Sequence, residues 1–445
     1  MKIGIVSMGC PKNLVDSEVM LGLLEKEGYE VSDEIAESDL AIVNTCSFIR
    51  DAKEESIDMI LELANLKKEG KLKKLIVAGC LPQRYREELT NELKEVDGFV
   101  GTNSIADIGR IVQETLNGEQ VVRIGKERYL YDHDTPRYLI APKHSVYIKI
   151  AEGCDNRCSY CIIPEIRGSY ISRPMESIIE EAEKLIDAGA KELNLISQDT
   201  TSYGKDIYGG PVLNKLLRRL VKIDGIRWIR LLYTHPAHFT DELIETIASE
   251  PAICKYIDLP LQHINDDILA RMGRKVTKDS ILSLLKNLRE RIEGLVLRTS
   301  FIVGFPGETE EAFKELLGFI EEIRFERLGV FAYSKEEGTL AYGFDSHIQE
   351  KTKHNRLKAV MELQRSISGQ YNQSLLGKRF TVLVDEVDEN DPHLYIARTY
   401  GDAPEVDGEV LVRSRRVCSK GEFLDVRVID TYEYDLVAEA VHEFA

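Results

Sequence analysis

The first part of the chain alternates short apolar runs with amphipathic segments. Three apolar runs, KIGIVSM, LAIVNT and KLIVAG, occur in the first 80 residues, and segments of helical periodicity follow them, as at residues 15–26 and 57–64. Apolar runs of strand length between amphipathic helices are typical of βαβ units that build a parallel sheet. The pattern therefore predicts an α/β domain with a parallel sheet over residues 1–117.

The same alternation resumes after a polar, proline-bearing stretch at residues 127–145, which we interpret as a linker. Six further strands are expected within VYIKIAEG, ELNLISQD, WIRLLYTH, YIDLPLQH, LVLRTSFIVG and RLGVFAYS. Six consecutive βα units predict a partial or full βα-barrel whose active site lies at the carboxyl ends of the strands. We assign residues 140–370 to this second domain.

The pattern changes to period-two alternation in the last part of the chain, residues 373–441. Alternating segments separated by turn residues occur in RFTVLVDEV, LYIARTY, GEVLVRS and EFLDVRVIDTYEYDLVAEAV. This alternation predicts a small antiparallel β-barrel. The 445 residues are thus expected to form a multidomain α/β protein with three domains.

Composition narrows the class of protein. A hydrophobic content of 43% and a charged content of 30% are ordinary for a globular protein. No apolar run approaches the roughly 18 residues that cross a bilayer, so we expect a cytoplasmic protein with no membrane partner. The net charge of −18 disfavours a phosphate backbone as partner, unless a local basic patch is present.

Three cysteines occupy equivalent positions in the first domain. Cys10, Cys46 and Cys80 each end a predicted strand, and the carboxyl ends of parallel strands meet at one edge of a sheet. Gathered thiolates suit zinc or an iron–sulfur cluster. A zinc ion would need a fourth ligand, and residues 1–117 contain no histidine. A single cysteine of this kind would be interpreted as a small buried residue. Three cysteines in equivalent positions favour binding of a metal or a cluster.

A second set of three cysteines follows the first strand of the predicted barrel. Cys154, Cys158 and Cys161 have the spacing C-x3-C-x2-C, which can hold three corners of a 4Fe–4S cluster and leave one iron open. Electron-carrier ferredoxins close that corner with a fourth cysteine, and structural zinc sites pair two CxxC hairpins. Neither feature is present here. Cys254 and Cys418 stand alone and are interpreted as buried structural thiols.

The second cysteine loop and its place in a βα-barrel resemble the radical S-adenosylmethionine (SAM) superfamily. This resemblance implies that the open iron chelates SAM and that the cofactor is cleaved to a 5′-deoxyadenosyl radical. No acid, base or nucleophile is assigned, because the clusters and SAM carry the chemistry. By the same resemblance, the SAM contacts are expected at Tyr160, Gln198, Arg298, Ile302 and Gly304.

The whole chain resembles the methylthiotransferases, with the last domain in the position of their TRAM domain. GCPKNLVDSE and EGCDNRCSYCIIPEIRGSYISRP resemble the RimO-type branch, which modifies an aspartate of small-subunit ribosomal protein twelve. In the tRNA-modifying branch, the segment that corresponds to GCPKN typically resembles GCQMN. The resemblance implies an auxiliary 4Fe–4S cluster at Cys10, Cys46 and Cys80, and the SAM cluster at Cys154, Cys158 and Cys161.

The implied activity is that of a transferase that converts the aspartate to its 3-methylthio derivative. The substrate carbon must lie between the two clusters, so the first cysteine edge and the barrel mouth are expected to face one another. The implied partners are ribosomal protein twelve, free or on the ribosome, a low-potential electron donor and a sulfur source. Residues 374–445 carry 16 acidic and 8 basic side chains. This negative balance favours a basic protein as the binding partner and argues against direct tRNA binding.

Several alternatives stay open from the sequence. The nearest is a tRNA adenosine methylthiotransferase with the same chemistry. Others are an iron–sulfur electron carrier, a nucleic-acid-binding protein without a reaction of its own, and a radical-SAM enzyme with unrelated chemistry. His235, His238 and His263 fall near the ends of two barrel strands and are interpreted as hydrogen-bonded loop residues rather than metal ligands.

Overall fold

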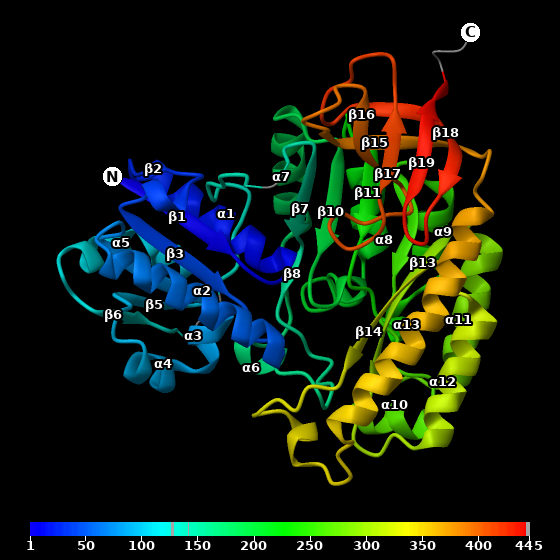
Figure 1. Cartoon of the computed structure of the whole chain (residues 1–445), viewed down its shortest axis with the longest axis horizontal. Coiled ribbons are helices and arrows are strands. Elements are labelled where there is room, and N and C mark those ends of the chain that lie inside the picture. The colour runs from blue at the N-terminus through cyan, green and yellow to red at the C-terminus, as the bar shows by residue number, and fades with distance from the viewer. Residues whose placement is uncertain (126–128, 141, 442–445) are drawn as a thin grey trace.

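The computed structural model of the chain describes residues 1–125, 129–140 and 142–441. The predicted linker at 127–145 lies partly outside the described residues, at positions 127, 128 and 141. Figure 1 shows three units in chain order: a blue to cyan α/β unit, a green to yellow barrel and a small orange to red barrel. No helix among the described residues is long and apolar enough to cross a membrane.

The first unit is a six-stranded parallel sheet with helices on both faces, which confirms the predicted α/β domain with a parallel sheet. Its strands run in the order β2-β1-β3-β4-β5-β6. They are β1 (Lys2–Ser7), β2 (Glu30–Val31), β3 (Leu40–Thr45), β4 (Lys74–Gly79), β5 (Gly98–Gly101) and β6 (Val121–Arg123). Apolar side chains of α1 (Pro11–Lys26) and α5 (Ile108–Leu116) pack on one face, and those of α2 (Arg50–Lys68) and α4 (Arg86–Glu92) pack on the other.

The central unit is a partial βα-barrel of six parallel strands, in the order β14-β13-β12-β11-β10-β7. Its strands are β7 (Ser145–Lys149), β10 (Glu192–Ile196), β11 (Trp228–Leu231), β12 (Ile253–Asp258), β13 (Val296–Val303) and β14 (Arg327–Ala332). The two edge strands, β7 and β14, do not pair with each other among the described residues, so the barrel is open on that side. The predicted arrangement of strands is confirmed.

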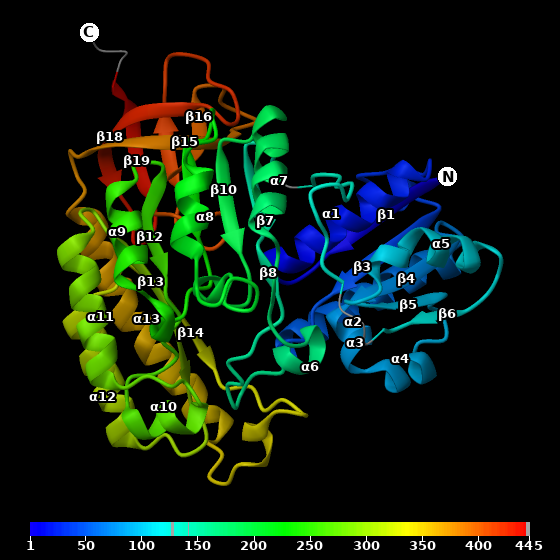
Figure 2. The same ribbon diagram turned by 180° about the vertical axis from the view of Figure 1, so that it is seen from behind.

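Helices cover the outside of this barrel. The helices after successive strands are α7 (Met175–Asp187), α8 (Leu213–Leu220), α9 (Asp241–Ser249), α10 (Asp266–Met272), α11 (Lys278–Arg291), α12 (Glu310–Ile323) and α13 (Glu350–Gln373). A two-stranded sheet of β8 (Ala151–Glu152) and β9 (Ile171–Ser172) and the short helix α6 (Ile163–Arg167) follow β7. Figure 2 shows that β8 and α6 lie between the barrel and the first unit.

The last unit is a closed five-stranded barrel, in the order β15-β16-β17-β19-β18. Its strands are β15 (Arg379–Val387), β16 (Leu394–Thr399), β17 (Val410–Arg413), β18 (Phe423–Thr431) and β19 (Leu436–Ala440). The prediction of a small β-barrel is confirmed, with one difference: β17 and β19 pair in parallel. A closed ring with an odd number of strands cannot be antiparallel at every pair, so at least one parallel pair is required.

A buried ion-pair cluster joins the last unit to the central barrel. Glu192 of β10 is fully buried, and its two carboxylate oxygens accept hydrogen bonds from Arg230 Nε at 2.9 Å and from Arg398 Nη2 at 2.9 Å. Arg398 belongs to β16 and also binds Asp385 of β15. Burial alone would raise the pKa of Glu192, but Arg398 and Arg230 together lower it to about 2.

We expect Glu192→Gln to lower the free energy of unfolding by about 3–5 kcal/mol at neutral pH, because two buried guanidinium groups lose their shared anion. The native pKa of Glu192 lies below its ordinary value of 4.5, so its contribution is complete above that pH. That contribution is lost as the pH falls from about 4.5 towards about 2. Urea unfolding of both proteins between pH 7 and pH 3 should show the difference shrinking on acidification.

The matched control is Glu183→Gln, which removes an exposed carboxylate from α7. It should change the unfolding free energy by no more than about 0.5 kcal/mol at any of these pH values. A Glu192→Gln deficit that stays constant down to pH 3 would contradict the role given to the Glu192 charge.

Candidate functional site

The first cysteine set lies at one edge of the first sheet. β1, β3 and β4 are parallel neighbours, so their carboxyl ends meet at that edge. Cys10 precedes α1, Cys46 directly follows β3, and Cys80 is the first residue of α3 (Cys80–Arg84). Cys10 and Cys46 are half-buried and Cys80 is buried. The structure therefore brings together three thiols that are more than 30 residues apart in the chain.

A glycine and an asparagine allow the close approach of these loops. Gly9 has a φ of +86°, and a Cβ at this position would lie only 2.6 Å from Cys46 Cβ and 3.0 Å from its Sγ. Asn13 Nδ2 donates hydrogen bonds to the backbone oxygens of Met8 at 3.0 Å and Thr45 at 2.9 Å. The loop that carries Cys10 is thereby fixed against the loop that carries Cys46.

The electrostatic environment of these thiols suits metal ligation. Burial raises the pKa of Cys80 to about 12, while the nearby charge of Arg167 acts in the opposite direction. Burial and then the negative charge of Cys10 raise the pKa of Cys46. Without a metal these two thiols hold their protons at neutral pH, and a metal that binds them displaces those protons. A set of three sulfurs, one buried and two half-buried, beside a cation fits an anionic iron–sulfur cluster.

The second cysteine set lies on the loop after β8. The backbone N–H of Cys154 donates to Gly168 O at 3.0 Å, and that of Cys161 donates to Cys158 O at 3.0 Å. Burial raises the pKa of Cys154 to about 11 and that of Cys161 to about 12. Arg274 Nη1 lies 3.9 Å from Cys158 Sγ. This set shares the features of the first one: clustered thiols, low solvent access and a buried arginine.

A contact between α6 and the first unit brings the first cysteine set close to the segment that follows the second set. Ile162 and Ile166, which follow Cys161, pack against Cys80. Arg167, at the end of α6, has its Nη2 3.7 Å from Cys80 Sγ. Residues that directly follow the second set therefore touch a thiol of the first set. Figures 1 and 2 both show α6 beside α3.

Four buried charges fix this contact. Arg167 binds Asp16 at 3.0 Å and Glu152 at 2.9 Å, and Lys149 binds the same two carboxylates. Arg167 Nη2 also donates to Asn13 Oδ1 at 2.6 Å. All five side chains are buried. Two cations and two anions thus neutralise each other at the boundary between α1 and the start of the barrel.

The residues expected to contact SAM fall into two groups. Tyr160 and Ile302 border one apolar cluster, which contains Met272, Phe305 and Tyr333. The cluster adjoins the second cysteine loop, because Ser159 donates its backbone N–H to Met272 O at 2.9 Å. Tyr160 and Ile302 thus pack against the same apolar cluster, which adjoins the second cysteine loop.

The other three residues expected to contact SAM lie at the end of a strand or within one. Gln198 is half-buried just after β10, and Gly304 follows β13 with a φ of +74°. Arg298 lies within β13 and forms ion pairs with Asp258 at 2.9 Å and with Asp407 of the last unit at 3.3 Å. The guanidinium group of Arg298 is therefore engaged by carboxylates of the protein itself.

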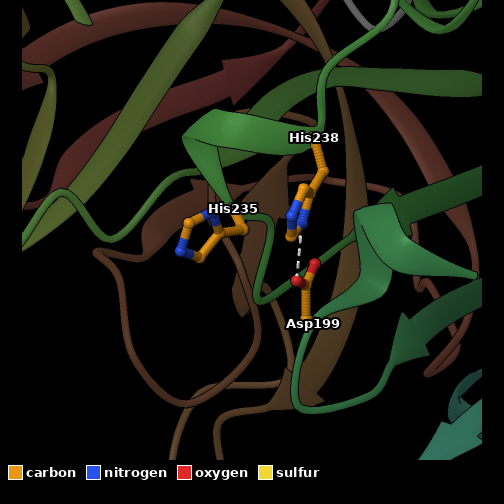
Figure 3. A group of neighbouring side chains, drawn as sticks. All are labelled: Asp199, His235 and His238. Atoms are coloured by element: carbon orange, nitrogen blue, oxygen red, sulfur yellow. Dashed lines mark hydrogen bonds and ion pairs between the residues drawn. The ribbon is translucent and has the colours of Figure 1, made fainter. Parts of the chain in front are cut away.

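Asp199 and two histidines form a group that the sequence did not indicate (Figure 3). One ligand atom from each of Asp199, His235 and His238 lies within 4.8 Å of the others. His238 Nδ1 lies 2.8 Å from Asp199 Oδ2, which also accepts a hydrogen bond from Asn156 Nδ2 at 2.8 Å. Thr201 donates to the other oxygen. Both carboxylate oxygens are thus hydrogen-bonded within the protein.

The pKa values agree with a hydrogen-bonded group. Burial would raise the pKa of Asp199, but the hydrogen bond and charge of His238 hold it well below its usual range. Burial and then the nearby charge of Arg274 lower the pKa of His235 to about 2, so this ring is neutral. Because Asn156 belongs to the second cysteine loop, the group supports that loop from the barrel side.

A lysine and a tyrosine that the sequence did not indicate lie beside the first cysteine set. Lys12 lies in the first turn of α1, and its Nζ is 2.9 Å from the centroid of the Tyr233 ring. Tyr233 follows β11 and has a φ of +60°. Burial lowers the pKa of Lys12 to about 8. Lys12 belongs to the motif GCPKN, so a lysine two residues after a candidate ligand was the available signal.

Comparison with protein families assigns each of the three units. Residues 2–101 match the uncharacterized protein family UPF0004, and residues 148–320 match the radical SAM superfamily. Residues 376–441 match the TRAM domain. These matches follow the first sheet, the central barrel and the closed barrel.

Relatives in several bacteria match almost the whole chain. A protein of Desulforamulus reducens is 51% identical over 438 residues, which cover 98% of this chain and 99% of the relative. A protein of Clostridioides difficile is 47% identical over 445 residues and covers all of both chains. Both relatives are named ribosomal protein uS12 methylthiotransferase RimO.

Among solved structures, the radical S-adenosylmethionine methyltransferase TsrM of Kitasatospora setae shares the fold. The TM-score is 0.58 at 15% sequence identity, and the match covers 90% of this chain and 92% of TsrM. At this identity the similarity is evidence of a common fold only.

We expect Arg167→Met to lower the free energy of unfolding by about 3–5 kcal/mol, because Asp16 and Glu152 then share a single buried cation. The first unit should also separate more readily from the barrel. Limited proteolysis within residues 129–140, which connect the two units, should be faster in the variant. Arg86→Met, which removes an exposed arginine, is the control and should behave like the wild type. Equal stability and equal proteolysis of the two variants would refute the role of this cluster.

Proposed function

The chain belongs to the family of ribosomal protein uS12 methylthiotransferases, and we propose that it transfers a methylthio group to an aspartate of uS12. The observation that carries this proposal is 47–51% identity to such enzymes over nearly the full length of the chain. The proximity of the first cysteine set to the segment that follows the second set supports it, because the reaction needs two sites beside one substrate carbon. The reaction replaces a C–H bond of the aspartate β-carbon with C–SCH3.

We assign a 4Fe–4S cluster to each cysteine set. Cys154, Cys158 and Cys161 supply three ligands from one loop and leave one iron for SAM. Cys10, Cys46 and Cys80 supply three ligands from three strand ends for an auxiliary cluster. When bound, these groups and SAM provide the sulfur, the methyl group and the radical that the reaction requires.

The residues around the second set would hold and orient SAM. Tyr160 and Ile302 offer an apolar surface that suits the adenine ring, and Gln198 offers an amide near the methionyl group. Arg274 beside Cys158 would stabilise negative charge on the cluster thiolates. The contact from Asn156 to Asp199 would keep the loop in one conformation.

The boundary between the two units would hold the substrate side chain and exclude water. Cys80 packs with Ile162 and Ile166, so these two side chains would keep water from that thiol. A ribosomal substrate places the reaction in the cytoplasm. A low-potential electron donor and a sulfur source are further required partners.

Replacement of single cysteines should distinguish the roles of the two clusters. In the reconstituted protein, Cys154→Ala should lose roughly half of the iron and should no longer cleave SAM, because the SAM cluster loses a ligand. Cys10→Ala should lose a similar share of iron, keep SAM cleavage and form no methylthio product. The measurements are iron and sulfide content, and 5′-deoxyadenosine after reduction with dithionite.

Cys254→Ala is the matched control, because Cys254 is a buried thiol of β12 outside both sets. It should keep all the iron and both activities. If Cys10→Ala still formed the methylthio product, the auxiliary site would play no part in the reaction.

The substrate is tested by anaerobic incubation of the reduced holoenzyme with SAM and either uS12 or unmodified tRNA. Mass spectrometry should detect a methylthio mass increase on one aspartate of uS12 and none on tRNA. The acidic last unit, with a net charge of −8 over residues 374–445, is the physical reason to expect no tRNA product. A methylthio mass increase on tRNA alone would contradict uS12 as the substrate, but it would still support methylthio transfer as the reaction.

A further inference from the structure

We propose that Lys12 binds the side-chain carboxylate of the target aspartate and thereby selects aspartate as the residue to be modified. This inference rests on the proposed function, because it names the group that recognises the substrate of that reaction.

Lys12 lies between the first cysteine set and the carboxyl end of β11. It follows Cys10 by two residues in the first unit, and its ammonium group lies over the ring of Tyr233 at the carboxyl end of β11. The same ammonium group is within electrostatic reach of Cys10, Arg167, Asp258 and Glu152. A single side chain thus spans from the first cysteine set to the mouth of the barrel.

Lys12 has no anionic partner within the described part of the chain. It is only 2% exposed, yet it makes no hydrogen bond or ion pair with a described residue. A buried charge without a partner is costly, and stacking on an aromatic ring offsets only part of that cost. The ammonium group is therefore suited to bind an anion that arrives from outside.

The neighbouring carboxylates do not fill this role. Asp16 and Glu152 are each bound by both Lys149 and Arg167. Asp258 is bound by Arg298 at 2.9 Å and also accepts a backbone hydrogen bond. The carboxylates nearest to Lys12 are thus engaged by other cations, so none of them is an ion-pair partner of Lys12.

Tyr233 is held in an unusual conformation that places its ring under Lys12. Its φ of +60° lies in the left-handed region, which costs energy for a residue with a large side chain. Two hydrogen bonds maintain this conformation: Tyr233 N–H donates to Asp258 Oδ2 at 2.8 Å, and Tyr233 C=O accepts from Thr200 N–H at 3.0 Å. Such strained residues cluster at ligand sites, which supports a site built around Lys12.

The chemistry of the substrate fits this position. The β-carbon of an aspartate is bonded directly to its carboxylate carbon, so a cation that binds the carboxylate also fixes the β-carbon. Because Lys12 is two residues from Cys10, that carbon would lie near the first cysteine set. Adenosine has no carboxylate, so the same contact would discriminate against a nucleoside.

The first test compares Lys12→Met and Lys12→Arg with the wild-type holoenzyme. Lys12→Met should keep its iron and its SAM cleavage, but its KM for uS12 should rise by about 30-fold or more, the cost of truncating one partner of a buried charge pair. Lys12→Arg keeps the charge and should recover part of this loss. Lys26→Met, at the exposed end of the same helix, is the control and should have the wild-type KM.

The second test measures binding of uS12 and of uS12 in which the target aspartate is changed to asparagine. The wild-type enzyme should bind the asparagine form more weakly, whereas Lys12→Met should bind both forms equally. An equal penalty for asparagine in both enzymes, or an unchanged KM in Lys12→Met, would overturn the inference. If the wild-type enzyme itself left uS12 unmodified, the proposed function would fail instead.

Discussion

The buried cluster of Asp16, Lys149, Glu152 and Arg167 is the interaction on which the rest of the site depends. Each charge in it would cost several kcal/mol if buried alone, and each is paired with two partners of opposite sign. Asp16 belongs to the first unit and the other three to the barrel, so only one placement of the two units satisfies all four. That placement also brings Cys80 against α6, and hence the first cysteine set close to the segment that follows the second set.

Much of this architecture follows from local rules. Strand-length apolar runs predicted β1, β3 and β4 of the first unit and the six strands of the central barrel, and period-two alternation predicted the last unit; β2, β5 and β6 were not predicted. The rule that parallel strands end at one edge brought Cys10, Cys46 and Cys80 together. The contact between the units could not be predicted in this way. It depends on Arg167 and Lys149 reaching Asp16, which lies more than 130 residues earlier in the chain. The hydrophobic periodicity of a sequence indicates which face of a helix or strand is buried. It does not indicate which charged residue of another element that face contacts.

The same limit applies to the partners of Arg298 and His238. The family resemblance implies that Arg298 contacts SAM, which stays a prediction; the sequence did not indicate that its guanidinium group binds Asp258 and Asp407, and Asp407 comes from the last unit. His238 was interpreted as a hydrogen-bonded loop residue, which agrees with the structure, but the sequence did not indicate its partner. It meets Asp199 because a short turn after β10 and another after β11 bring the two loops together. In each case, the partner of the side chain is a residue that lies far away in the sequence.

Electrostatics at two length scales then explain why a lysine is needed at the mouth. The net charge of −18 attracts a basic ribosomal protein as a whole, yet the residue to be modified is itself an anion. The same negative charge opposes the approach of an anionic side chain, and a local cation would offset that repulsion. Lys149, Arg167 and Arg298 are occupied by carboxylates of the chain, whereas Lys12 has no ion-pair partner among the described residues, and this is why we propose that it binds the incoming carboxylate.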